Sequence, residues 1–208
     1  MFKIHLDTDL GGDIDDLCAL AMLLRLPEVE IVGITTVAEV AGKRAGYVRH
    51  ILALEQRESI PVAAGADVSL RPYRWLQVLL DERKYWGEQI PAVANSLAQA
   101  LALLKQSIEQ GATVIGIGPF TNLSLLEKKY PGILGTVPLF LMGGYIYPVG
   151  EGLPQMGNDS DYNIQADVES AQYVIEHSNP TLIPLTVTVE TALRRAHLPT
   201  LRNAFALG

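Results

Sequence analysis

The sequence has little cysteine: among its 208 residues, only Cys18 is a cysteine. A single cysteine cannot form a disulfide within the chain, so no disulfide framework supports the fold. Cys18 lies in the apolar segment from Leu17 to Ala21, where a small apolar residue is expected to be buried. We therefore predict that Cys18 belongs to the core and is not a nucleophile.

Long apolar runs and an excess of positive charge are also missing. The best candidate for a membrane span, Leu17 to Leu26, is shorter than the roughly 18 residues required and contains Arg25. The first residues lead directly into a strand-like segment, without the pattern of a signal peptide. The 16 Lys and Arg against 23 Asp and Glu leave a net charge of −7, which disfavours a polyphosphate partner. We expect a cytoplasmic protein that binds neither membrane nor nucleic acid.

The apolar pattern predicts one α/β domain over residues 1–208, with a mainly parallel central sheet and helices on both faces. Hydrophobic residues make up 49% of the chain, which is enough for one sizeable core. Short β-branched runs alternate with longer segments that carry apolar residues at three- and four-residue spacing. The expected strands are Phe2–Leu6, Glu30–Thr36, Ile60–Ala63, Thr113–Gly116, Val137–Met142 and Thr181–Leu185. The expected helices are Asp15–Leu26, Lys43–Glu55, Ala92–Gln110, Leu123–Lys129 and Val168–Glu176. The interval Asp67 to Ile90 is expected to be rich in loops.

Five carboxylates stand within ten residues between the first strand and the first helix. We call this segment, from Asp7 to Asp16, the acidic loop; its acids are Asp7, Asp9, Asp13, Asp15 and Asp16. Two carboxylates about 4 Å apart repel by roughly 4 kcal/mol at an effective dielectric of 20, so the cluster stays ionised only beside a cation. Hard oxygen ligands without a nearby cluster of histidine and cysteine favour Ca²⁺ or Mg²⁺. Ca²⁺ is the better candidate, because it accepts more ligands and looser geometry. Helix capping explains one or two of these acids, but not five.

This loop resembles the N-terminal signature of the inosine–uridine preferring nucleoside hydrolase family, in a form with two extra residues before the paired aspartates. Four later blocks are similar to the family in the same order. They are Ile34-Thr35-Thr36-Val37, the segment Gly116 to Leu123, Leu141-Met142-Gly143-Gly144, and Asp161-Tyr162-Asn163-Ile164 with Asp167 to Ala171 after it. The resemblance implies a Rossmann-like nucleoside hydrolase architecture, shortened at its C-terminus.

The resemblance also implies a reaction, the cleavage of the N-glycosidic bond of ribonucleosides by water. Asp15 matches the general base, and Asp9, Asp16 and Thr121 match the metal ligands, Thr121 through its backbone carbonyl. The implied Ca²⁺ would hold the water and the ribose 2′- and 3′-hydroxyls. Residues matching the sugar-binding positions are Met142, Asp161 and Asn163. Each later match has a structural alternative: Thr121-Asn122 can cap the next helix, Gly143-Gly144 can be only a turn, Met142 can be core, and Asn163 can be a satisfied amide in a strand-like segment.

The sequence departs from the family pattern at two places. Glu39-Val40 stands where the family has Gly-Asn, so the sugar contact of that Asn is expected to be lost. The late His-Asp of the family is not found, and His197, followed by Leu and Pro, is a poor match. Asp7 and Asp13 match no family role, although Asp7 can bond backbone at the strand end. We predict weakened calcium binding, because fewer carboxylate ligands lower calcium affinity.

Two other functions remain open at this point. A riboside-binding relative without hydrolytic activity would keep the same loop. A haloacid dehalogenase-type phosphatase also begins with Asp-x-Asp after its first strand. It needs a later Lys and a second acidic pair near a strand end, and no Asp-Asp or Glu-Asp pair follows the acidic loop. The resemblance further suggests a homo-oligomer with a small-molecule nucleoside or riboside as its ligand. Base preference does not follow from the sequence.

Overall fold

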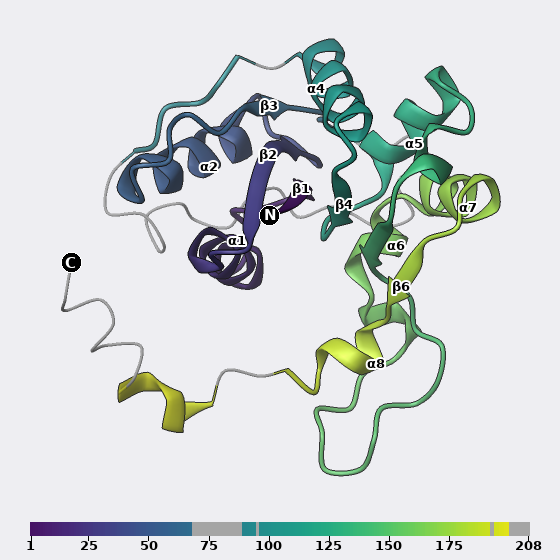
Figure 1. The fold of residues 1–208 in the computed structure, drawn as a ribbon. Helices are drawn as coiled ribbons and strands as arrows, with labels where there is room; N and C mark the ends of the chain where they lie inside the picture. The colour runs from purple at the N-terminus through teal and green to yellow at the C-terminus, as the bar shows by residue number, and fades with distance from the viewer. Residues whose placement is uncertain (68–88, 95, 192–193, 200–208) are drawn as a thin grey trace.

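The computed structural model describes residues 1–67, 89–94, 96–191 and 194–199 and contains a six-stranded parallel sheet (Figure 1). The strand order is β3-β2-β1-β4-β5-β6, and every pairing is parallel. The strands are β1 Phe2–Thr8, β2 Val29–Thr36, β3 Val62–Ala64, β4 Thr113–Gly116, β5 Leu139–Met142 and β6 Thr181–Ile183. The predicted α/β class is confirmed, and each strand end lies within two residues of its expected place. Most of the interval expected to be loop-rich, residues 68–88, lies outside the described residues.

The helices largely follow the predicted pattern. They are α1 Asp15–Arg25, α2 Lys43–Leu54, α4 Leu97–Glu109, α5 Thr121–Lys129, α6 Tyr162–Ala166, α7 Val168–His177 and α8 Leu185–Thr188. Helix α4 begins five residues later than expected because the hydroxyl of Ser96 caps it, accepting from Gln99 N at 3.4 Å. The expectation of a strand-like segment around Asn163 is wrong. That segment forms the short helix α6 because the side chain of Asp161 accepts from Ile164 N at 2.8 Å.

Two apolar clusters cover opposite faces of the sheet. On one face α1 and α2 pack with residues of β1 and β2, and on the other α4, α5 and α7 pack with residues of β4 and β5. In β1, Ile4 and Leu6 point into the first cluster, whereas His5 between them contacts Ser107 of α4. This alternation is what a strand buried on both faces requires.

Cys18 is exposed, so its expected place in the core is wrong. Helix α1 buries a stripe at three- and four-residue spacing, formed by Leu17, Leu20 and Leu24. Cys18 lies one residue after Leu17, a rotation of about 100° around the helix, and therefore points to the solvent side.

Parallel pairing places the carboxyl ends of the strands along one edge of the sheet. Asp7 near the end of β1 is in register with Thr35 of β2 and with Gly116 of β4. The segments after β1, β2, β4 and β5 therefore emerge side by side, where ligands bind in open α/β sheets. This edge holds every residue that the sequence proposed for the site.

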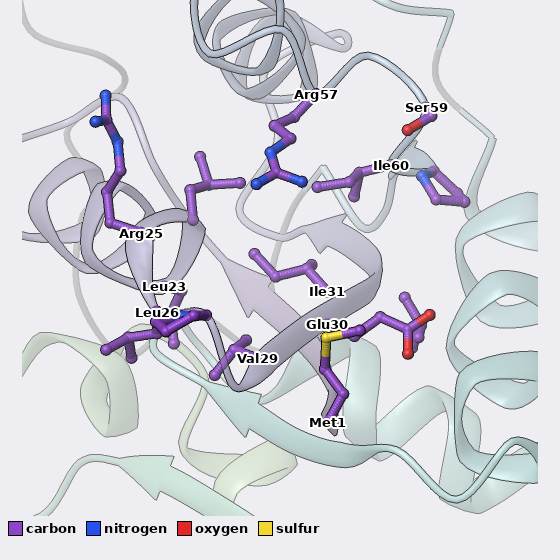
Figure 2. Close-up of a pocket in the computed structure, with 14 residues that line it drawn as sticks. Met1, Leu23, Arg25, Leu26, Val29, Glu30, Ile31, Arg57, Ser59 and Ile60 are labelled. Carbon is purple, nitrogen blue, oxygen red and sulfur yellow. The ribbon is translucent and has the colours of Figure 1, made fainter.

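The opposite edge of the sheet holds a different kind of hollow. A pocket of 630 Å³ lies between the end of α1, the start of β2 and the segment before β3 (Figure 2). Apolar side chains such as Ile31 and Ile60 line it together with Arg25 and Arg57, and Glu30 is its one carboxylate. The pocket lacks the clustered acids of the carboxyl edge. No helix in the described part of the chain is long and apolar enough to cross a membrane.

Candidate active site

The acidic loop turns tightly from β1 into α1 and brings three carboxylates together. Gly11 has a φ of 121°, a conformation that favours glycine and permits the turn. Ligand oxygens of Asp13, Asp15 and Asp16 lie within 4.8 Å of one another. Asp13, which matched no family role, is therefore part of the cluster. Asp16 is buried in the first turn of α1 and accepts a hydrogen bond from the hydroxyl of Thr8, whereas Asp13 and Asp15 are exposed.

The acids of this loop are poorly satisfied by the protein itself. A hydrogen bond with Asp15, together with burial, raises the pKa of Asp13 to about 7. Burial raises the pKa of Asp9 to about 6, although the charge of Arg44 opposes the shift. Burial and the neighbouring charge of Asp9 also raise the pKa of Asp16 well above its ordinary value. A divalent cation among these groups would reverse the shifts, because it favours their ionised forms.

Asp9 lies against the segment that follows β4. A Cβ added at Gly118 would meet Asp9 Oδ1 and the Asp9 backbone nitrogen at 2.9 Å, and Val37 Cγ1 at 2.7 Å. Only a glycine therefore allows the two segments to approach so closely. This contact joins the acidic loop to the segment that carries Thr121.

Asp7 is bonded to two side chains, so the suggestion that it bonds backbone is wrong. Its Oδ1 accepts from Thr35 Oγ1 at 2.5 Å and from Asn122 Nδ2 at 2.8 Å. Its Oδ2 is buried without a partner, and burial raises the pKa of Asp7 to about 7. Asn122 also donates to the Thr36 carbonyl at 2.9 Å and accepts from Ala66 N at 2.9 Å. Asn122 thus ties β1, β2 and the end of β3 together beneath the site.

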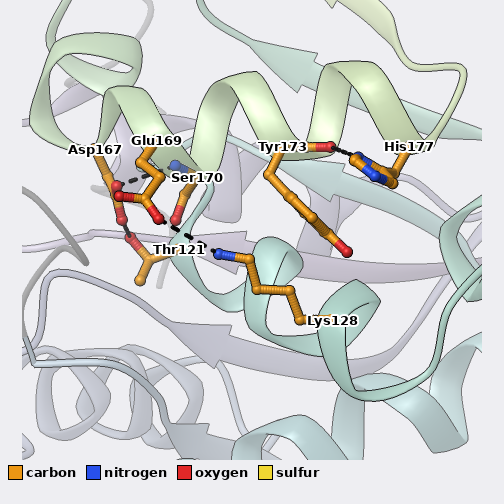
Figure 3. Close-up of polar contacts among 7 residues, drawn as sticks. All are labelled: Thr121, Lys128, Asp167, Glu169, Ser170, Tyr173 and His177. Atoms are coloured by element: carbon orange, nitrogen blue, oxygen red, sulfur yellow. Dashed lines mark hydrogen bonds and ion pairs between the residues drawn. The ribbon is translucent and has the colours of Figure 1, made fainter.

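The capping alternative for Thr121-Asn122 is wrong as well, because Phe120 is the N-cap of α5 and neither side chain caps the helix. Thr121 instead donates to Asp167 Oδ2 at 2.7 Å, and Asp167 Oδ1 accepts from Ser170 N at 3.1 Å at the start of α7 (Figure 3). Lys128 and Glu169 join the same two helices through an ion pair of 3.9 Å. These contacts fix the position of Thr121 at the start of α5.

Met142 and Asn163 contact each other at the end of β5. Asn163 Nδ2 donates to the Ile117 carbonyl at 2.8 Å and to the carbonyl and sulfur of Met142, each at 3.1 Å. Within the described residues its Oδ1 accepts no hydrogen bond, although Asn163 is buried. The amide is therefore held through its nitrogen while its oxygen stays available for a hydroxyl donor.

Asp161 has two structural bonds. Its Oδ1 caps α6, and its Oδ2 accepts from Gly144 N; Gly144 follows β5 with a φ of 99°. Asp161 thus holds the irregular segment after β5 against α6. Because each carboxylate oxygen can accept two hydrogen bonds, these contacts leave acceptor capacity at Asp161.

Glu39 stands where the family pattern has glycine, and its carboxylate is directed to the protein. It accepts from the backbone nitrogens of Val40 at 3.1 Å, Arg44 at 3.2 Å and Ala45 at 2.7 Å, and from the hydroxyl of Thr36. It therefore caps α2, whose own N-cap, Gly42, has no side chain.

Two residues that the sequence did not single out face the acidic loop. A Cβ added at Gly12 would lie 3.9 Å from a terminal nitrogen of Arg44, and the charge of Arg44 lowers the pKa of Asp9 and Asp13. Burial, and next the charge of Asp9, raise the pKa of Tyr162, which stands between Asp161 and Asn163. The only signal in the sequence was position: Tyr162 lies inside a matched block, and Arg44 is a charged residue in the apolar pattern of α2.

His197 gains no support as a site residue. It is exposed, and its Nδ1 accepts from Arg194 N at 3.1 Å within its own turn. His5 is buried between Ser107 and Thr35, and burial lowers its pKa to about 3.

Comparison with known proteins identifies the family. The family model of the inosine-uridine preferring nucleoside hydrolases matches residues 4–206, and the chain belongs to this family. Curated relatives include the pyrimidine-specific ribonucleoside hydrolases of Salmonella paratyphi B and Salmonella typhi, each 27% identical over 212 residues. These matches cover 96% of this chain but only 65% of the length of those enzymes.

Solved structures confirm the fold. A purine-preferring ribonucleoside hydrolase from Gardnerella vaginalis matches with a TM-score of 0.76 at 22% identity, over 97% of this chain and 66% of that chain. An inosine-guanosine nucleoside hydrolase matches with a TM-score of 0.72 at 20% identity, over 97% and 67% of the two chains. The names of these relatives specify different substrates, which are pyrimidine nucleosides, purine nucleosides, and inosine with guanosine.

Proposed function

We propose that this chain hydrolyses the N-glycosidic bond of ribonucleosides, releasing base and ribose, with a site for a cation and the sugar at the carboxyl edge of its sheet. One observation carries the proposal: the poorly satisfied acids of the acidic loop lie at the same sheet edge as Met142 and the free Oδ1 of Asn163. Family membership supports the same reaction and speaks against the phosphatase alternative.

The donor set of the acidic loop fits Ca²⁺. We propose that Asp9, Asp16 and the backbone carbonyl of Thr121 hold the ion, with Asp13 next to them. All these donors are hard oxygens, and they come from a loop and a helix start rather than a rigid octahedral frame, which favours Ca²⁺ over Mg²⁺. When bound, the ion supplies positive charge that acidifies a water ligand and orients the sugar hydroxyls.

Asp15 is proposed as the general base. It is exposed at the first residue of α1 and lies within the acid cluster, so its carboxylate can reach a water at the site. Loss of the base leaves positive charge on the ribosyl group, and the ionised acids beneath the sugar stabilise this charge. Asp15 would take the proton of the attacking water as the bond to ribose forms.

The sugar is proposed to lie between the acidic loop and the segment after β5. Asn163 would accept a hydrogen bond from a ribose hydroxyl through Oδ1, since its nitrogen is already bonded to Ile117 and Met142. Asp161 would accept a hydrogen bond from a second hydroxyl with its remaining lone pairs, and Met142 would pack under the ring.

We further propose a cytoplasmic role in nucleoside salvage. By family resemblance we also propose a homo-oligomer, and size-exclusion chromatography would check this oligomeric state.

Incubation of the 208-residue chain with nitrophenyl riboside tests the proposed function. We expect nitrophenolate release with CaCl₂ and none with EGTA. Thermal stabilisation by ribose without any release would instead favour the binding-only relative. Cleavage of an aryl phosphate in place of the riboside would identify a phosphatase.

A further inference from the structure

Arg44 is a buried cation at the acidic site that the proposed reaction does not use. Only 4% of its surface is exposed. It lies in the first turn of α2, where its backbone nitrogen bonds to Glu39, and its Nε donates to the Ala38 carbonyl at 2.8 Å. Ala38 has a φ of 48°, so its carbonyl belongs to a defined turn after β2. These contacts fix the guanidinium group at the end of β2.

The guanidinium points toward the acidic loop but does not pair with any of its acids. A terminal nitrogen of Arg44 lies 3.9 Å from the position of a Cβ at Gly12, in the middle of that loop. Within residues 1–67, 89–94, 96–191 and 194–199, Nη1 and Nη2 have neither a hydrogen bond nor an ion pair. A buried guanidinium group normally donates two parallel hydrogen bonds to one carboxylate. Here the charge faces the acidic loop without a direct bond to one of its carboxylates.

The charge of Arg44 has opposite effects on the metal-free and the metal-bound state of the acidic loop. Without a divalent cation, the buried positive charge of Arg44 attracts the carboxylates of the acidic loop that it faces. With a divalent cation, the same fixed charge repels the ion. We propose that Arg44 is a built-in counter-charge of the acidic loop, a positioning residue that stabilises the loop without metal and lowers its affinity for divalent cations. This inference rests on the proposed cation site and specifies how its affinity is set.

Calcium titration calorimetry at constant ionic strength tests the proposal with three variants. Arg44→Met keeps much of the buried stem and removes the charge, so calcium binding should become about tenfold tighter. Arg44→Lys keeps the charge and should bind calcium like the wild type. Arg49→Met is the matched control, because it removes the same charge from an exposed position of α2 and should leave the affinity unchanged.

A merely structural role of Arg44 predicts the opposite sign, since a loosened loop binds calcium more weakly. Unchanged or weaker calcium binding by Arg44→Met would therefore overturn the proposal. A rise in the KM for the riboside without tighter calcium binding would overturn it too. Absence of calcium binding by the wild-type chain would overturn the proposed cation site as well. Failure of the Arg44 proposal alone would leave calcium binding by the wild-type chain intact.

Thermal unfolding provides a second measurement and also shows whether each metal-free variant is folded. In EGTA, Arg44→Met should unfold at a lower temperature than Arg49→Met, and calcium should raise its Tm by more than it raises that of the control. Arg44→Gln, which keeps a donor for the Ala38 carbonyl, should repeat this pattern. An equal calcium-induced shift in the Arg44 variants and the control would overturn the proposal.

Discussion

Two groups of carboxylates in this chain differ in what satisfies their oxygens. Those at helix and turn starts accept backbone N–H groups, as Glu39 does at α2, Glu127 at the turn of Gly132 and Leu134, and Asp161 at α6. Those of the acidic loop receive few donors, and burial or mutual contact raises the pKa of Asp9, Asp13 and Asp16. The first group completes the fold, whereas the second needs something that the described chain does not supply.

The difference separates acids that complete the fold from acids that we propose to bind a cation. A carboxylate that accepts backbone donors stays ionised and stabilises the helix start through its charge. A carboxylate crowded by other acids destabilises the folded chain unless a cation arrives. Substitutions in the two groups should therefore have opposite consequences for stability and for cation binding.

The largest effect is expected for Asp15→Asn, which removes the proposed general base from the acidic loop. We expect kcat for nitrophenyl riboside to fall by about 10²–10⁴-fold at saturating calcium, because the attacking water loses its proton acceptor. Binding of ribose should be largely retained. Glu28→Gln, an exposed acid beyond α1, is the control and should keep full activity. Retained turnover in Asp15→Asn would exclude Asp15 as the base.

A paired experiment on Asp16 and Glu127 examines the comparison itself. Asp16→Asn should weaken calcium binding at least about tenfold, yet leave the metal-free Tm equal or higher, because a buried acid with a raised pKa disappears. Glu127→Gln should lower the free energy of unfolding by about 1–3 kcal/mol, because a charged acceptor of two N–H groups is weakened. Its calcium affinity should not change. If both variants lost stability equally and kept calcium binding, the two groups of acids would not differ.

A smaller effect is expected where the acidic loop contacts the segment after β4. Gly118→Ala should cost about 1–3 kcal/mol of stability, since its Cβ would overlap with Asp9 and Val37. Calcium affinity should fall with it, because Asp9 must move. Gly135→Ala is the control, since a Cβ there meets nothing within 4 Å. Denaturant unfolding of both variants measures the difference, and equal stabilities would contradict the close contact.

The sheet and the acidic loop could be predicted because their signals are local. Strands buried on both faces are short apolar runs, and the five acids stand within ten residues of one another. Contacts between distant residues could not be predicted, such as Asp7 with Asn122 or Arg44 with the acidic loop, because nothing in the spacing pairs them. Cys18 was misplaced because an apolar segment does not indicate which of its residues faces solvent.

The raised pKa values also give calcium binding a definite pH dependence. Between a pH of about 4 and 7 the metal-free folded chain holds protons on Asp9 and Asp13 that the unfolded chain has lost, so these acids favour folding less as pH rises. Calcium prefers the ionised carboxylates. The calcium-induced rise in Tm should therefore be small at pH 5.5 and largest near pH 8. His5, whose pKa is lowered to about 3, has the opposite effect on stability, but it contributes equally with and without calcium and cancels in this rise.

Proton release during calcium titration at pH 7 tests the central claim most directly. Calorimetry in two buffers of different ionisation enthalpy measures the protons that leave the protein as the ion binds. Because Asp9 and Asp13 titrate near 6 and 7, we expect net proton release in the wild-type chain and a smaller release in Asp13→Asn. Calcium binding without proton release, or no calcium binding at any pH from 5.5 to 8, would contradict the claim that the acidic loop binds a divalent cation.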